Sequence, residues 1–324
     1  MSALLSARGV SMHYRLKRGW FGRGEPVTVK ALTEIDLDIE AGETLALVGE
    51  SGSGKSTLGR VLIRTLSPSA GTIAFRGSDI TALDRRRLRP LRRHFQIVFQ
   101  DPFGSLNPRL SIGRAVAEPL VVHGLAKGAA LRARVAEALS LVGLDPAWAG
   151  RRPHEFSGGQ RQRICIARAV IGRPDFIVAD EALSALDVTL QGQMLGLFAD
   201  LKQRFGLTYL FISHDLDTVR QIADRVAVLY LGRIVELAPA SALFEGARHP
   251  YTQALLAAMP VPDPVRERAR IEAPLRGDPP SPANPPSGCA FHPRCPRATD
   301  KCRADLPALR TLAAGHQAAC HYAD

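Results

Sequence analysis

The sequence contains no run of about 18 uninterrupted apolar residues, the length that a membrane-spanning helix requires. Residues 1–14 also lack a charged start followed by a long apolar segment, so they do not predict a signal peptide. We therefore expect the protein to stay in the cytoplasm and to associate with a membrane only through partner proteins.

The 324 residues are 46% hydrophobic and 23% charged, which is typical of a soluble globular protein with a sizeable core. The net charge of +11 leaves nucleic acid and anionic lipid open as partners. The basic residues cluster within 15–23 and 85–93. We interpret both clusters as solvated surface and expect no nucleic-acid partner.

A glycine-rich segment, residues 49–57, follows the apolar run 44–48 and precedes a stretch with helical periodicity. A strand leading through such a turn into a helix is typical of a phosphate-binding loop. Its glycines let successive N–H groups point at an anion, and the helix dipole adds to that field. The predicted nucleotide-binding residues are Gly49, Glu50, Ser51, Gly52, Ser53, Gly54, Lys55, Ser56 and Thr57.

Individual side chains of this loop have predicted roles. Lys55 would reach the β- and γ-phosphates of a nucleotide, and the Ser56 hydroxyl would bind Mg²⁺. A second candidate for Mg²⁺ is Asp180, which together with Glu181 ends the apolar run 176–179. The carboxyl end of a buried strand is where ligands bind in α/β sheets. Asp180 would hold Mg²⁺ through its water shell, and Glu181 would polarise the water that attacks the γ-phosphate.

The chain alternates short β-like runs with helical patterns from residue 4 to about residue 239, which predicts an α/β core. Three helical patterns between residues 114 and 171 have no strand between them, so we expect an inserted helical subdomain. The proline-rich stretch 260–286 predicts an extended linker before a short cysteine-bearing tail. Strands are predicted, among others, at 44–48, 72–75, 176–179 and 209–212, and helices at 56–66, 159–171 and 190–204.

A second Ser/Gly turn, Ser157-Gly158-Gly159-Gln160, opens a predicted helix. It could bind an anion of its own or contribute to a nucleotide held by a partner, or Ser157 could serve only as an N-cap. In a chain that also has a phosphate loop, this turn resembles the signature motif of ABC ATPases, and Phe156 stands where leucine is usual.

Other segments resemble the remaining motifs of that family in the expected order. Gln100 resembles the glutamine that senses Mg²⁺ and couples to the transmembrane partner, and residues 184–187 resemble the loop that crosses the dimer interface. His214 resembles the switch histidine that contacts the γ-phosphate. Tyr14 is the candidate for stacking on adenine. The resemblance thus implies catalytic roles for Glu181, His214 and Gln100, and Mg²⁺ binding by Ser56, Gln100 and Asp180.

The resemblance also implies a fold: an α/β P-loop NTPase with a RecA-like core, an antiparallel β-subdomain and an inserted helical subdomain at about 103–172. We expect the nucleotide-binding domain to cover residues 1–245 and a C-terminal extension to cover 246–324.

Finer features resemble the ATPases of oligopeptide/dipeptide importers: the insertion 17–23, the stretch 99–109 and the run 249–252. The insertion is similar to that of the second ATPase subunit of such importers. The implied partners are another ATPase subunit in a heterodimer, two transmembrane permease subunits and an extracytoplasmic peptide-binding protein. The implied location is the cytoplasmic face of the plasma membrane. Nickel or glutathione-like cargo, and a soluble ABC ATPase acting on nucleic acid or ribosomes, are the alternatives.

Four of the five cysteines lie in the last 36 residues: Cys289, Cys295, Cys302 and Cys320. Disulfides are disfavoured in a reducing cytoplasm, so we expect a metal site. The spacing lacks the paired knuckles of structural zinc, whereas four thiolates suit an iron–sulfur cluster. The importer resemblance implies a [4Fe–4S] cluster, with Zn²⁺ as the alternative and with His292, His316 and His321 as substitute ligands.

Overall fold

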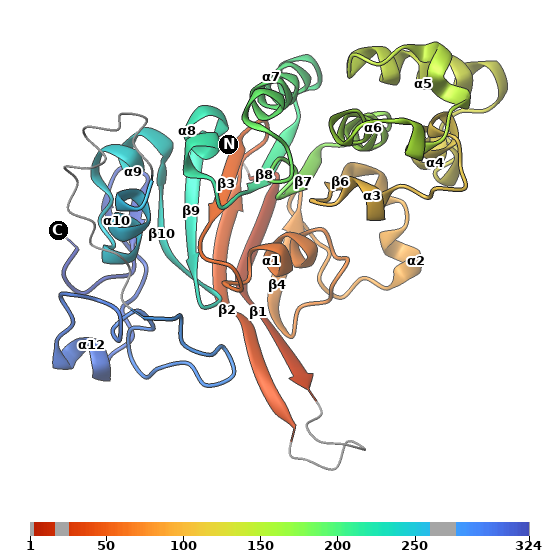
Figure 1. Ribbon diagram of the computed structural model, residues 1–324. Coiled ribbons are helices and arrows are strands. Elements are labelled where there is room, and N and C mark those ends of the chain that lie inside the picture. The colour runs from red at the N-terminus through yellow and green to blue at the C-terminus, as the bar shows by residue number, and fades with distance from the viewer. Residues whose placement is uncertain (1–2, 17–25, 260–276, 324) are drawn as a thin grey trace, which may run out of the picture. The chain divides into compact units, whose positions relative to one another are not determined.

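The computed structural model describes residues 3–16, 26–259 and 277–323, which form two compact units. The first unit combines Met1–Ile39, Leu45–Thr81 and His214–Asp324, and the second combines Glu40–Thr44 with Ala82–Ser213. Figure 1 shows both units. The predicted insertion 17–23 lies outside the described residues, and so does most of the predicted linker.

The first unit contains a four-stranded antiparallel sheet in the order β2-β1-β4-β5. Strand β2 explains why this sheet has one buried face: Ile35, Leu37 and Ile39 are buried and alternate with Asp36 and Asp38. The sheet confirms the expected antiparallel β-subdomain. Its strands are β1 (Leu5–Leu16), β2 (Val27–Ile39), β4 (Ala70–Phe75) and β5 (Ser78–Asp79).

The remaining strands of the first unit follow the order β11-β12-β10-β9-β3, in which β3 and β9 run parallel. Strand β3 is buried along its whole length, as expected for a strand covered on both faces. These strands are β3 (Thr44–Val48), β9 (Arg225–Tyr230), β10 (Arg233–Pro239), β11 (Arg310–Ala313) and β12 (His316–Ala318). In the described part of this unit the helices are α1 (Lys55–Leu62), α8 (Leu216–Ile222), α9 (Ala240–Gly246), α10 (Pro250–Ala257) and α12 (Asp300–Ala304).

One hydrophobic core of this unit includes residues from the C-terminal segment. Tyr251 and Phe291 are buried in the same cluster as Val226, Val228 and Tyr230 of β9. The rings of Tyr230 and Phe291 meet edge to face at 5.3 Å. The segment after residue 245 therefore packs within the core of the first unit, and the predicted domain boundary at residue 245 stays a prediction.

The second unit has three parallel strands in the order β8-β7-β6. These are β6 (Phe95–Val98), β7 (Phe176–Asp180) and β8 (Thr208–Ile212). No strand interrupts the helices that follow β6 and precede β7, as the sequence predicted. The helices of the unit are α2 (Arg85–Leu88), α3 (Pro102–Ser105), α4 (Ile112–Val122), α5 (Gly128–Leu141), α6 (Gly158–Val170) and α7 (Val188–Phe205), with short 3-10 turns at Leu91–His94, Pro146–Gly150 and Pro153–Glu155.

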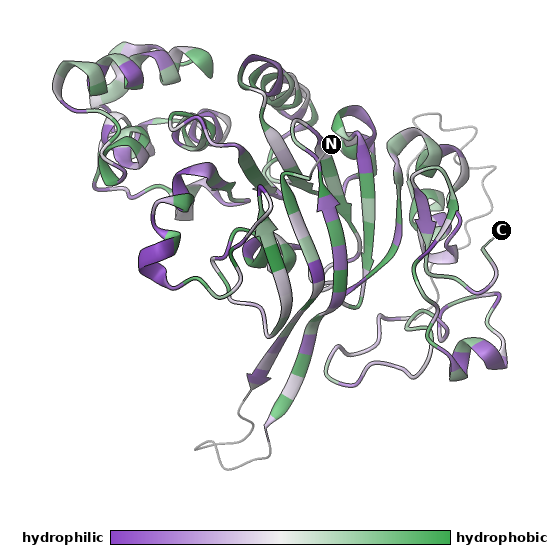
Figure 2. Ribbon diagram, turned by 180° about the vertical axis from the view of Figure 1, so that it is seen from behind, coloured by the Kyte–Doolittle hydropathy of each residue, from purple (hydrophilic) through white to green (hydrophobic). Residues whose placement is uncertain are grey.

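The hydropathy of the elements matches their burial (Figure 2): α2 is mostly hydrophilic, in keeping with its three arginines, whereas β7 and β8 are buried throughout. Within the described residues, no helix combines the length and apolar character needed to cross a bilayer.

Candidate functional site

The predicted phosphate loop joins β3 to α1 in the first unit. Its glycines have positive φ angles: 148° at Gly49, 79° at Gly52 and 107° at Gly54. A Cβ atom on Gly49 would lie 2.2 Å from the Leu229 carbonyl oxygen, and one on Gly54 would lie 2.5 Å from that of Ala31. The close approach of two neighbouring strands therefore requires glycine at both positions.

Lys55 is the first residue of α1, and its side chain is buried beneath the loop. Its ammonium donates hydrogen bonds to the carbonyl oxygens of Gly49 (2.7 Å) and Glu50 (3.0 Å). The loop thus curls around a cation at the positive end of an eight-residue helix, which favours an anionic ligand. The Ser53 hydroxyl is buried with no hydrogen-bond partner among the described residues, so a phosphate oxygen would satisfy it.

Glu50 is fixed by residues that the sequence did not single out. Its backbone N–H donates to the Tyr251 hydroxyl at 2.8 Å, and its carboxylate accepts two hydrogen bonds from Arg294. Tyr251 belongs to the predicted run 249–252, but no sequence signal links it, or Arg294, to the loop.

Two further predicted residues belong to the first unit. His214 is exposed, and the neighbouring Asp215 caps α8 by accepting the N–H groups of Asp217 and Thr218. Tyr14 is half-buried on β1, where it pairs with Val29 of β2. The γ-phosphate contact of His214 and the stacking of Tyr14 on adenine both stay predictions.

In the second unit, Asp180 ends β7 as predicted and is buried. Glu181 follows with a φ of +50°, which is uncommon for a residue with a side chain. Its N–H donates to the Ile212 carbonyl at the end of β8, and its carbonyl accepts from Ser184. These bonds hold a strained backbone in place, an arrangement that is frequent at functional sites.

Gln100 is exposed directly after β6, and Asp101 then caps α3. A residue that the sequence analysis missed lies close by. Gln162 of α6 is fully buried, and its amide donates to the Ala182 carbonyl at 2.7 Å and to the Phe99 carbonyl at 3.5 Å. It connects the helix of the second Ser/Gly turn with the segments that carry Gln100 and Glu181. Its only sequence signal is its place in that helix.

The Ser/Gly turn opens α6 with a capping box, in which Ser157 and Gln160 exchange hydrogen bonds between side chain and backbone. Ser157 therefore acts as an N-cap, one of the roles considered for it from the sequence. Ser157 is also exposed, and the ring of Phe156 is buried against Trp148 at 5.9 Å. A Cβ on Gly159 would lie 3.1 Å from the Leu190 side chain, whereas Gly158 has open space beside it. The surface of this turn is thus available to a partner molecule.

The four tail cysteines line one small cavity, together with His249, His292 and His321. All four are free thiols, and burial raises the pKa of Cys289 to about 11. Within the described part of the chain, no group of three or more His, Cys, Asp or Glu side chains is placed to hold a metal ion. The structure therefore gives no support to the predicted metal centre beyond the convergence of the thiols.

His316, considered above as a substitute metal ligand, contacts a carboxylate and does not line the cavity of the cysteines. Its Nε2 lies 2.7 Å from the buried Glu236 carboxylate. The same carboxylate accepts the backbone N–H groups of Arg248 (2.6 Å) and His249 (3.0 Å). Glu236 therefore fastens the tail strand β12 and the start of α10 to β10.

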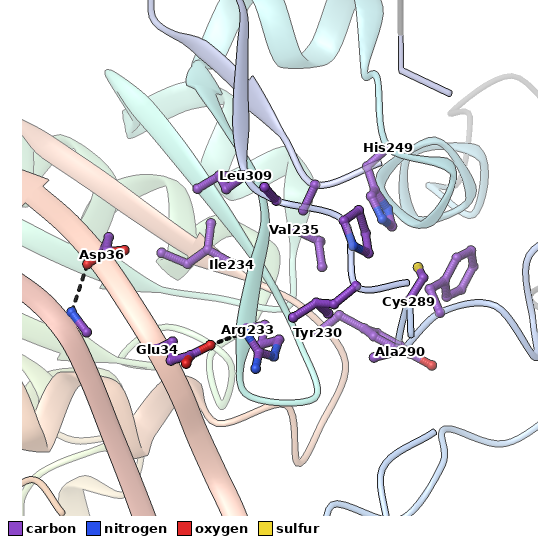
Figure 3. A pocket seen from close by; sticks show the side chains of 16 residues that line it. Glu34, Asp36, Tyr230, Arg233, Ile234, Val235, His249, Cys289, Ala290 and Leu309 are labelled. Carbon is purple, nitrogen blue, oxygen red and sulfur yellow. Dashed lines mark hydrogen bonds and ion pairs between the residues drawn. The ribbon is translucent and has the colours of Figure 1, made fainter. Parts of the chain in front are cut away.

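A larger cavity of about 610 Å³ lies in the first unit, between β2, β10 and the tail (Figure 3). Tyr230, His249 and Cys289 line one part of it, and the ion pair of Arg233 with Glu34 lies at another. No residue of the phosphate loop lines it, so this cavity is separate from the predicted nucleotide site.

Comparison with known proteins identifies the family of the chain. Residues 32–184 match the ABC transporter family, and residues 235–302 match the C-terminal region of oligopeptide/dipeptide transporters. A probable peptide ABC transporter ATP-binding protein of Sinorhizobium fredii is 51% identical over 98% of this chain and 90% of its own length. The chain belongs to the ABC transporter family. It is the ATP-binding cassette of that family, and the predicted family and fold class are confirmed.

Other relatives agree with this assignment. A di/tripeptide transport ATP-binding protein of Pseudomonas aeruginosa is 48% identical over 100% of this chain and 99% of its own length. The solved dimer of the ATP-binding cassette MJ0796 in a post-hydrolysis state, bound to ADP and Pi, is 28% identical. It aligns with a TM-score of 0.64 over 73% of this chain and 98% of its own. The cassette is an ATPase, and ATP and Mg²⁺ are its ligands.

Proposed function

We propose that this ABC cassette hydrolyses ATP to power peptide uptake through a membrane permease. The observation that carries the proposal is the phosphate loop itself, in which three positive-φ glycines bring the backbone around the buried Lys55 ammonium. Relatives at about 50% identity are described as peptide transport or import ATP-binding proteins, which favours peptides over nickel or glutathione-like cargo.

The chemistry is divided among a few side chains. Lys55 and the loop N–H groups bind and neutralise the β- and γ-phosphates. Ser56, Gln100 and Asp180 hold the Mg²⁺, which supplies charge neutralisation at the phosphate oxygens. Glu181 orients and polarises the attacking water. The strained backbone of Glu181 is held by hydrogen bonds, and this fixes the direction of its side chain. His214 contacts the γ-phosphate, and Tyr14 stacks on adenine.

The exposed Ser/Gly turn serves a second cassette. In a head-to-tail dimer, Ser157, Gly158, Gly159 and Gln160 complete the nucleotide site of the partner ATPase, a close homologue of this chain. Two permease subunits and an extracytoplasmic peptide-binding protein complete the importer. The cassette then acts at the cytoplasmic face of the plasma membrane as a peripheral subunit. The nucleotide-binding part covers residues 1–245, with the helical subdomain at about 103–172, and the extension covers 246–324.

The cysteine tail holds an iron–sulfur cluster in this proposal. Four thiols that converge on one cavity match the donor set of a [4Fe–4S] cluster. A cluster is larger than one ion, so its cysteines stand farther apart than the ligands of a single zinc. Zn²⁺ bound by the same thiols is the alternative.

Substitution of Lys55 tests the nucleotide site. Lys55→Ala removes the cation that compensates the phosphate charge, so ATP binding and turnover should be lost. Lys127→Ala, at an exposed position before α5, is the matched control and should behave as the wild type. ATP hydrolysis by the Lys55→Ala protein at the wild-type rate would refute the assignment. Loss of peptide uptake in cells that carry the same variant tests the transport role.

Anaerobic purification tests the cluster. We expect about four irons per chain and a brown protein. Cys295→Ser should lose the iron, whereas Cys165→Ser, which removes the buried cysteine of α6, should keep it. If the protein contains stoichiometric zinc and no iron, the tail holds a zinc site and not a cluster. A metal-free wild-type protein would exclude both.

A further inference from the structure

Arg294 lies in the tail between Cys289 and Cys295, yet its side chain reaches the phosphate loop. Its two terminal nitrogens donate to the two carboxylate oxygens of Glu50, at 2.7 and 2.9 Å. Only 5% of the Arg294 side chain and 24% of the Glu50 side chain are exposed. A bidentate pair with so little solvent contact fixes the relative position of its partners far better than a surface ion pair does.

The tail and α10 together hold Glu50 at three atoms. Arg294 binds both oxygens of its carboxylate, and the Tyr251 hydroxyl accepts its backbone N–H at 2.8 Å. The Glu50 carbonyl accepts from Lys55, the residue predicted to bind the phosphates. One residue of the loop thus joins the C-terminal segment directly to the phosphate-binding lysine.

The backbone segment that carries Arg294 is packed into the core. Phe291, three residues earlier, is buried and packs on Tyr230 at 5.3 Å and on Tyr251 at 5.4 Å. Tyr230 and Tyr251 are themselves in contact at 4.6 Å. The aromatic cluster therefore positions both groups that hold Glu50, the guanidinium and the Tyr251 hydroxyl.

The pair also sets the charge of the loop. An uncompensated Glu50 carboxylate would repel the phosphates of a nucleotide bound to the same loop, and its repulsion would be strong at a partly buried position. The guanidinium of Arg294 cancels this charge while the loop keeps the positive charge of Lys55. Glu50 then acts as an anchor for the loop at no electrostatic cost to ATP.

We propose that Arg294 is a positioning residue for ATP, through which the cysteine tail sets the shape and charge of the phosphate loop. The inference rests on the proposed nucleotide site and extends it: the tail is part of the ATP-binding apparatus, and its integrity controls the affinity for ATP.

The test compares ATP dissociation constants in the full-length protein, with a fluorescent ATP analogue as the probe. Arg294→Met should weaken binding about tenfold or more, a change of about 1.4 kcal/mol, because the uncompensated Glu50 carboxylate would then repel the phosphates bound to the same loop. Arg294→Lys keeps the charge but not the bidentate geometry. Its affinity for ATP should therefore lie between that of the wild type and that of Arg294→Met. Arg303→Met is the control, because Arg303 of the same tail pairs with the exposed Asp300 and should leave ATP affinity unchanged.

A double substitution separates charge compensation from general damage to the fold. Glu50→Gln in the Arg294→Met background removes the uncompensated charge and should recover most of the lost affinity. A double variant that binds ATP as weakly as Arg294→Met, or more weakly, overturns the proposal, as does wild-type affinity in Arg294→Met. If Arg294→Met does not fold, the neutral but polar Arg294→Gln, with and without Glu50→Gln, carries the same comparison. Failure of the proposed nucleotide site is distinguishable, because Lys55→Ala would then also keep wild-type ATP binding.

Discussion

Replacement of Gly49 by alanine tests whether the geometry of the phosphate loop is as tight as the structure indicates. The new Cβ would lie 2.2 Å from the Leu229 carbonyl oxygen, well under the 3.0 Å below which Cβ contacts are essentially never found. Relief requires that β9 or the loop itself move, which costs about 1–3 kcal/mol as overpacking does. The positive φ of 148°, which essentially only glycine adopts, adds at least about 1 kcal/mol. We therefore expect about 2–4 kcal/mol of lost stability.

The matched control is Gly52→Ala. Gly52 also has a positive φ, of 79°, but a Cβ there meets no atom within 4 Å. Its cost should be limited to backbone strain, about 1 kcal/mol. Thermal unfolding should show Gly49→Ala melting about 3–6 °C below the wild type and Gly52→Ala about 1–2 °C below it. ATP affinity should fall at least about tenfold in Gly49→Ala, because the shifted loop misdirects its N–H groups. Equal melting temperatures for the two variants would refute the reasoning.

Three other predictions follow. Glu181→Gln should retain ATP affinity while hydrolysis nearly stops, and gel filtration should show ATP-bound dimers; rapid turnover would place the base elsewhere. Ser157→Arg should block hydrolysis at the partner's site in a mixed dimer, and a loss confined to the mutated subunit's own loop would contradict the head-to-tail geometry. Burial lowers the pKa of His249 to about 4, so the unfolded state binds more protons below pH 6.5 and stability should fall on acidification. Between pH 7 and pH 5, urea unfolding should show about 2 kcal/mol more loss for the wild type than for His249→Asn, and equal losses would exclude His249 as the cause.

Local sequence pattern was sufficient to predict several elements of the second unit. The strand predicted at 176–179 is observed at Phe176–Asp180, and the strand at 209–212 begins one residue earlier, at Thr208. The helix predicted at 159–171 is observed at Gly158–Val170. These elements have continuous apolar runs or a Ser/Gly N-terminus, so neighbouring residues alone determine their limits.

The long strands β1 and β2 were harder to predict. Strand β2 runs from Val27 to Ile39, but only its second half alternates clearly between buried and exposed residues. Strand β1 has register shifts between Ala7 and Val10 and again before His13, which break the period of two. The sequence therefore predicted only the regular part of this sheet.

Contacts between distant segments could not be predicted at all. Arg294 and Glu50 are 244 positions apart, and His316 and Glu236 are 80 apart. Nothing in a charged residue's immediate sequence tells which opposite charge it will meet, because the pairing depends on how β10, α10 and the tail pack. The glycine motif indicated the ligand of the site, but not the residues that hold the loop.

These two contacts also bear on the limits of the nucleotide-binding part. A boundary drawn after residue 245 follows the end of the family motifs. It would nevertheless separate Glu236 from Arg248, His249 and His316, which contact its carboxylate, and Glu50 from Arg294. Two buried or half-buried carboxylates would lose their partners, and the core would lose Tyr251 and Phe291. A buried charge without a partner is strongly destabilising. The loop predicted to bind phosphate and the cysteine tail therefore depend on the same packing, although sequence motifs divide them into two regions.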